Sequence, residues 1–143
     1  MADVYLASVR AKPAELVVLK RLKEDLLDAE HRSMFEDEAR IMPRLSHPNV
    51  VRTIEVGSQE GWPYLSMEFL DGLPLDQCWE AVAALGEASV KHLVCELLEG
   101  LHYAHELRSP EGQPLDVVHR DVSPQNVFVT YDGRVTLVDF GIA

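Results

Sequence analysis

The sequence predicts an α+β fold, with an antiparallel sheet and one helix in its first half and a mainly helical second half. Short apolar runs separated by turn residues recur before residue 70, as is typical of antiparallel strands. A long amphipathic pattern over about residues 87–107 repeats at three- and four-residue steps and predicts a helix. Two further apolar runs, joined by an Asp-Gly pair, predict a hairpin near the end of the chain.

Composition limits the classes of protein to consider. A chain of 143 residues that is 47% hydrophobic can bury one core. The net charge of −11 argues against a nucleic-acid or anionic membrane surface. No apolar run approaches the roughly 20 residues of a membrane span, and the first residues lack the features of a signal peptide. Cys78 and Cys95 suit neither a metal site nor a disulfide framework, so we expect a cytoplasmic protein.

The first half of the chain contains four strand-like runs. They are Val4–Val9, Leu16–Lys20, Val50–Val56 and Trp62–Leu70. The residues Ala11–Ala14 predict the turn between the first two runs, and Gly57–Gly61 the turn between the last two. The second run ends in Lys20. A lysine at a strand end is usually solvated, so any role for it depends on a partner elsewhere.

A helix is expected between the second and third runs. Ser33 and Glu36 have the spacing of a capping box, which predicts that the helix begins there. Pro43 removes a helical hydrogen bond, so the helix should kink or end near Met42.

Glu38 is the candidate partner of Lys20. It falls on the same side of the predicted helix as Met42 and Leu45, so its carboxylate should face apolar neighbours. A buried carboxylate needs a counter-charge, and Lys20 is the natural one. The alternative is that Glu38 is an exposed acid in an acidic segment.

The predicted hairpin near the end of the chain gathers polar residues. Its strands are expected at 127–130 and 135–138. Because a hairpin brings its outer ends together, Asn126 and Asp139 should lie side by side, with Asp121 close by. Such a group of oxygen atoms suits Mg²⁺.

These motifs resemble those of a known family. His119-Arg120-Asp121, then Asn126, then Asp139-Phe140-Gly141, resembles the catalytic and metal loops of eukaryotic-type protein kinases, and most closely the bacterial serine/threonine members. Val17-Val18-Leu19-Lys20 and residues 64–75 are similar to other kinase segments. The resemblance implies a two-lobed kinase-like fold, with 1–70 in the small lobe and 71–143 in the first part of the large lobe. It also implies an incomplete domain, because the glycine-rich loop would precede Val4 and the activation segment would follow Gly141.

The resemblance implies a role for each polar residue. Asp121 would orient the substrate hydroxyl, and Asn126 and Asp139 would hold Mg²⁺. Lys20, kept in place by Glu38, would stabilise the phosphates of ATP.

The resemblance also implies an adenine slot. Met67 would sit at the gate behind it, backbone groups of residues 68–70 would meet the adenine edge, Val4 and Val18 would cover the ring, and Phe128 would lie below it. The full set expected to contact the nucleotide is Val4, Val18, Lys20, Met67, Glu68, Phe69, Leu70, Phe128 and Asp139. Taken alone, each apolar member is more often plain core.

The function implied is ATP-dependent phosphoryl transfer to serine or threonine hydroxyls of a protein substrate, with ATP and Mg²⁺ as cofactors. Ser123 stands where serine/threonine kinases usually have a lysine, so the choice between serine/threonine and tyrosine acceptors stays open. A pseudokinase-like nucleotide-binding scaffold and a small-molecule phosphotransferase are the alternatives. Arg120 and the Asp-Phe-Gly motif favour a protein substrate over the latter.

Overall fold

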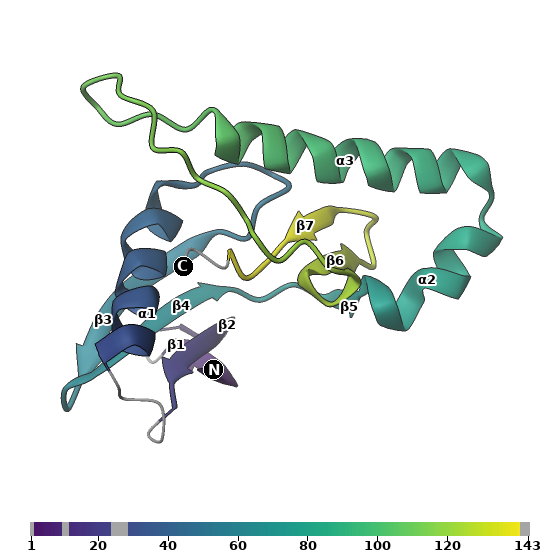
Figure 1. Ribbon diagram of the computed structural model, residues 1–143. Helices are drawn as coiled ribbons and strands as arrows, with labels where there is room; N and C mark the ends of the chain where they lie inside the picture. The colour runs from purple at the N-terminus through teal and green to yellow at the C-terminus, as the bar shows by residue number, and fades with distance from the viewer. Residues whose placement is uncertain (1, 10–11, 24–28, 141–143) are drawn as a thin grey trace. The chain divides into compact units, whose positions relative to one another are not determined.

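The structure is a computed structural model that describes residues 2–9, 12–23 and 29–140 (Figure 1). The chain forms two compact units. The first comprises residues 1–46 and 52–69, and the second comprises residues 47–51 and 70–141. Gly141, the last residue of the Asp-Phe-Gly motif, lies outside the described residues.

A four-stranded antiparallel sheet forms the first unit. Its strands are β1 (Ala2–Val9), β2 (Lys12–Leu22), β3 (Thr53–Gln59) and β4 (Trp62–Glu68), in the spatial order β1-β2-β4-β3. The four predicted strands are therefore confirmed, but their bounds differ. Residues 12–14, predicted as part of a turn, belong to β2. Similarly, β3 extends through Gln59, so the predicted five-residue turn is reduced to Glu60 and Gly61, both with positive φ.

Helix α1 (Ala29–Ile41) lies in the same unit. It is followed by the short 3₁₀ helix η2 (Met42–Arg44), so the predicted break at Pro43 is confirmed. The predicted capping box is wrong. Ser33 lies inside the helix, and Glu36 instead pairs with Arg32, one turn earlier, at 3.0 Å. The local motif failed because the preceding residues continue the helix.

The register of the sheet decides which side chains share a face. Lys20 lies opposite Val4 on one side and Leu65 on the other, and Val18 lies opposite Met67. Because side chains alternate along a strand, these residues all project from one face. The core lies on this face, where Leu65 and Met42 are fully buried.

The second unit includes the five residues 47–51, which separate α1 from β3 along the chain. Val50 and Val51 were predicted to begin a strand of the sheet, and this was wrong. The Val51 N–H donates to the Leu137 carbonyl at 2.9 Å, and the Leu137 N–H donates to the Asn49 carbonyl at 2.8 Å. Both valines are buried, so apolar packing on the hairpin at the end of the chain takes precedence over β propensity.

The rest of the second unit is helical with one small sheet. Its elements are β5 (Gly72–Pro74), α2 (Leu75–Ala84), α3 (Glu87–His105), η3 (Pro124–Asn126), β6 (Val127–Thr130) and β7 (Val135–Leu137). The predicted long helix and the predicted hairpin are both confirmed, and the turn of the hairpin has Gly133 at φ 90°. Helix α3 packs against β7 (Figure 1). No helix in the described part of the chain has the length and apolar character to cross a membrane.

Candidate functional site

An ion pair joins α1 to β2. Lys20 Nζ lies 2.7 Å from Glu38 Oε1 and 2.9 Å from Oε2, so the ammonium bridges both carboxylate oxygens. The two side chains are only 12% and 10% exposed. Glu38 is held there because Phe35, on the same side of α1, and Met42, directly after α1, are buried in the core. The inward placement of Glu38 predicted from the spacing is therefore what the structure shows.

Three of the apolar residues expected around the adenine lie on the same face of the sheet as Lys20. Val4 is the cross-strand neighbour of Lys20, and Val18 and Met67 face each other on the adjacent row. Val4 is 62% exposed, whereas Met67 is buried. The face of the sheet that carries Lys20 thus offers apolar side chains next to a fixed cation.

Residues 68–70, at the end of β4 and directly after it, were expected to meet the adenine edge with their backbone groups. The Glu68 N–H already donates to the Arg52 carbonyl at 3.0 Å, and the Glu68 carboxylate accepts the Arg52 N–H at 2.9 Å. The backbone N–H groups that remain as candidates for the adenine edge are therefore those of Phe69 and Leu70. Phe69 is half-exposed, and Leu70 belongs to the second unit.

A second set of polar residues surrounds the hairpin of the second unit. Asn126 ends η3 directly before β6, and the Val138 N–H donates to the Asn126 carbonyl at 3.0 Å. Val138 is therefore the pairing partner of Asn126, and Asp139 directly follows Val138. The two residues lie at the same end of the hairpin, as the sequence predicted. The Asn126 side-chain amide donates to Asp121 twice, to the backbone carbonyl at 3.0 Å and to Oδ2 at 2.8 Å.

The backbone at two of these positions is in the left-handed region. Arg120 has φ 64° and Asp139 has φ 60°. An L-residue in this region costs about 1–2 kcal/mol, and such conformations concentrate at functional sites. Arg120 directly precedes Asp121, and Asp139 directly follows the residue that pairs with Asn126. These two left-handed residues point to a backbone conformation that the surrounding packing holds in place.

His119 and Phe140 support this loop from below the surface. Their rings lie 4.4 Å apart and both residues are buried. His119 Nε2 lies 3.1 Å from the Val138 carbonyl, so this nitrogen donates and the ring links the segment before Asp121 to the hairpin. Burial lowers the pKa of His119, although the hydrogen bond to Val138 and the carboxylates of Asp121 and Asp139 act in the opposite direction. A lowered pKa favours the neutral ring, which is consistent with a packing role for His119.

The donor set near the hairpin fits a magnesium ion. The Asn126 side-chain nitrogen donates to Asp121, so the side-chain oxygen Oδ1 is the atom of this amide that could bind a metal ion. Asp139, which would supply the second oxygen ligand, comes shortly after β7, the strand paired with the one that follows Asn126. Within the described residues no group of three or more His, Cys, Asp or Glu side chains has the arrangement of a metal site. Two protein oxygen ligands are nevertheless what Mg²⁺ needs when substrate phosphates supply others.

Some features of the two units carried no sequence signal. Asn49 is one: its side-chain nitrogen donates to Glu96 on α3 at 2.7 Å and to the Val135 carbonyl at 2.8 Å. A Cβ on Gly100 would lie 2.9 Å from the Asn49 carbonyl oxygen, so glycine lets α3 approach this segment. The left-handed backbone at Arg120 and Asp139 was likewise not predictable from residue type.

Comparisons with known proteins show the family to which the chain belongs. The family model described as protein kinase domain matches residues 1–143. Among curated relatives, the tyrosine-protein kinase MasK of Myxococcus xanthus is 38% identical over 150 residues, covering 100% of this chain and 23% of that protein. The probable serine/threonine-protein kinase PknB of Lactococcus lactis is 35% identical, and PrkC of Bacillus subtilis is 30% identical; the chain covers 22% and 21% of them.

Solved structures give the same result. A crystal structure of the PknI kinase domain of Mycobacterium tuberculosis superposes with a TM-score of 0.76 at 32% identity, covering 100% of this chain and 56% of that one. The chain thus spans about a fifth of the length of these curated relatives and about half of a solved kinase domain. The chain belongs to the protein kinase family and carries part of its two-lobed fold.

Proposed function

We propose that the protein containing this chain transfers the γ-phosphoryl group of ATP to serine or threonine hydroxyls of a protein substrate. The observation that carries the proposal is the bridged Lys20–Glu38 pair, with nitrogen–oxygen distances of 2.7 and 2.9 Å. Such a pair presents a fixed cation for phosphate oxygens. The apolar residues Val4, Val18 and Met67 on the same face support an adenine site beside it.

The reaction needs little covalent chemistry from the protein, so the residues act by position and charge. In the proposal, Asp121 accepts a hydrogen bond from the acceptor hydroxyl and orients it toward the phosphorus. Its hydrogen bond from Asn126 restrains its carboxylate. Asn126 and Asp139 hold the magnesium ion, which neutralises charge on the phosphates when bound. Lys20 contacts the phosphates, and the backbone of residues 68–70, with Phe128, completes the adenine slot.

Tyrosine is the second candidate acceptor. The relative MasK is named a tyrosine-protein kinase and is 38% identical, and Ser123 replaces the usual lysine of serine/threonine kinases. The relatives PknB and PrkC are named serine/threonine kinases, and they support serine or threonine as the acceptor.

The proposal also includes a cytoplasmic location, because the reaction uses ATP. The free thiols of Cys78 and Cys95 are in line with this location.

The test measures transfer of labelled γ-phosphate from Mg-ATP to a generic protein substrate. The enzyme should be encoded by the whole reading frame around this chain, with Asp121→Asn as the variant. Asp116→Asn is the matched control, because Asp116 is an exposed aspartate of the same segment that also has positive φ. We expect Asp121→Asn to remove transfer and Asp116→Asn to retain it, and hydrolysis of the product to release phosphoserine or phosphothreonine. Phosphotyrosine alone would establish the second candidate, and equal rates for both variants would refute the role of Asp121.

A further inference from the structure

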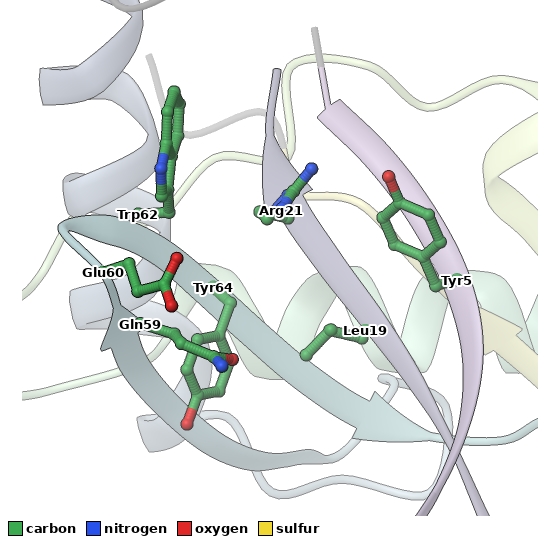
Figure 2. A pocket seen from close by; sticks show the side chains of 7 residues that line it. All are labelled: Tyr5, Leu19, Arg21, Gln59, Glu60, Trp62 and Tyr64. Atoms are coloured by element: carbon green, nitrogen blue, oxygen red, sulfur yellow. The ribbon is translucent and has the colours of Figure 1, made fainter. Parts of the chain in front are cut away.

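A pocket lies on the face of the four-stranded sheet that points away from Lys20. Arg21 is opposite Tyr64 in the register, and Tyr5 is opposite Leu19. Since side chains alternate, these residues project from the face opposite to Lys20 and α1. They border a cavity of about 380 Å³ (Figure 2). The lining residues are Tyr5, Leu19, Arg21, Gln59, Glu60, Trp62 and Tyr64.

Arg21 is the unusual member of this pocket. Its guanidinium carbon lies 5.8 Å from the centre of the Tyr5 ring and 6.0 Å from that of Trp62, and Figure 2 shows it between these two side chains. Its Nε is buried and has no hydrogen-bond partner among the described residues. Asp3, its cross-strand neighbour, lies 3.9 Å from Lys23 instead. A guanidinium that has no hydrogen-bond partner among the described residues favours a ligand that accepts hydrogen bonds in its plane.

The floor beside Arg21 is fixed by Tyr64. A Cβ on Gly57 would lie 2.5 Å from the Tyr64 hydroxyl oxygen, so the ring occupies the space that a side chain at Gly57 would fill. The hydroxyl donates to Glu55 at 2.7 Å, which holds the ring across the neighbouring strand. A glycine inside a strand weakens it, so its presence in β3 is consistent with a need for this close contact. The position of the Tyr64 ring, which forms the floor of the pocket, is therefore fixed before any ligand binds.

The chemistry of the lining selects the ligand. A planar carboxylate matches the donors of Arg21, and the Tyr5 and Trp62 rings with Leu19 favour an apolar group beside it. Glu60, which also borders the pocket, repels a doubly charged phosphate more strongly than a singly charged carboxylate. The volume lies near the lower end of the range for ligand pockets, which suits one or two side chains.

We propose that this pocket docks a peptide segment of a partner protein in which a glutamate or aspartate adjoins an aromatic residue. The carboxylate binds the Arg21 guanidinium, and the aromatic ring packs against Trp62 and Leu19. The site is separate from the nucleotide face, so it would hold a substrate or regulator without occupying the site of phosphoryl transfer.

Titration calorimetry with acetyl-Gly-Phe-Glu-Gly-amide tests the proposal on the protein encoded by the whole reading frame. The neutral peptide with glutamine in place of glutamate and the peptide with phosphoserine in its place are titrated in parallel. Hydrogen bonds to charged groups are strong enough that losing the carboxylate, or changing Arg21→Gln, should weaken binding about tenfold or more. Arg52→Gln is the control, because Arg52 is an exposed arginine of the same unit outside the pocket. Circular dichroism checks that each variant is folded, and Arg21→Lys should bind at an intermediate level, because it keeps the charge without the planar fork.

Each outcome decides the question. Binding that requires both the carboxylate and Arg21, and that Arg52→Gln leaves unchanged, supports the proposal. Equal affinity for the glutamate and glutamine peptides would overturn it, as would absence of binding up to about 1 mM. Tighter binding of the phosphoserine peptide would overturn the choice of a carboxylate and assign the pocket to phosphopeptides. None of these results depends on kinase activity, so the docking proposal and the catalytic proposal can fail separately.

Discussion

Breaking the ion pair between Lys20 and Glu38 should strongly destabilise the first unit. In Glu38→Leu, the Lys20 ammonium loses its carboxylate partner, and it belongs to a side chain that is only 12% exposed. Removing one partner of a buried pair costs about 3–5 kcal/mol, and the residual exposure places this pair near the lower end, at about 3 kcal/mol. Replacing both partners by apolar residues, in Lys20→Met/Glu38→Leu, should recover most of this loss, because no charge is then left buried.

Urea denaturation followed by circular dichroism measures these effects. With a slope of about 2 kcal/mol/M, a loss of about 3 kcal/mol lowers the midpoint by about 1.5 M. Glu36→Leu is the matched control on the same helix, because Glu36 pairs with Arg32 at 3.0 Å with both side chains more than half exposed. An exposed pair at this spacing contributes only about 0.3–0.5 kcal/mol.

Two results would contradict the reasoning. One is a Glu38→Leu midpoint within error of that of Glu36→Leu, which would mean that the pair at 2.7 Å is as weak as an exposed one. The other is additivity, in which the double variant loses the sum of the two single losses. Additivity would show that Lys20 and Glu38 do not stabilise each other.

Three further predictions concern the second unit. Asp139→Asn keeps a residue type that tolerates the observed φ of 60°, so the fold should persist while Mg-ATP turnover falls by about 10²-fold or more; an unchanged rate would remove Asp139 from the metal site. Asn49→Asp places a carboxylate against Glu96 and the Val135 carbonyl, so the free energy of unfolding should fall by about 3 kcal/mol; an unshifted urea midpoint would show that the contacts at 2.7 and 2.8 Å contribute little. Because burial lowers the pKa of His119, the unfolded state takes up its proton first as the pH falls below 6.5, and stability is lost by up to about 1.4 kcal/mol per pH unit. His119→Gln should remove this component, seen as a smaller drop in melting temperature between pH 7 and 5; parallel pH profiles for the two proteins would refute it.

The features predicted correctly from the sequence depend mostly on local pattern. The hairpin follows from an Asp-Gly turn between β-branched runs, and the inward position of Glu38 follows from helical spacing. The errors arise where distant packing decides the structure. Val50 and Val51 have strand-like sequence, yet they pack on the hairpin that forms almost ninety residues later, as the Val51–Leu137 hydrogen bond shows.

The residues of the candidate site could be proposed from the sequence, but the backbone conformation that positions them could not. The sequence predicted roles for Lys20, Glu38, Asp121, Asn126 and Asp139, and these roles stay predictions. The structure shows two contacts among these residues, Lys20 with Glu38 and Asn126 with Asp121. The positive φ of Arg120 depends on tertiary packing, so no local pattern indicates it. The pocket around Arg21 was missed because its residues come from three separate stretches, 5, 19–21 and 59–64, that only the strand register brings together.

The five residues 47–51 interrupt the first unit while belonging to the second. Neither unit is therefore a continuous piece of polypeptide, and no single cut or splice separates them. A chimera that exchanges the first unit between relatives needs three junctions, one on each side of this segment and one after Phe69. A single junction placed after β4 carries Asn49 of one parent onto the α3 of the other. Recombination within this family should accordingly conserve the match between Asn49 and Glu96, whichever parent supplies the surrounding sheet.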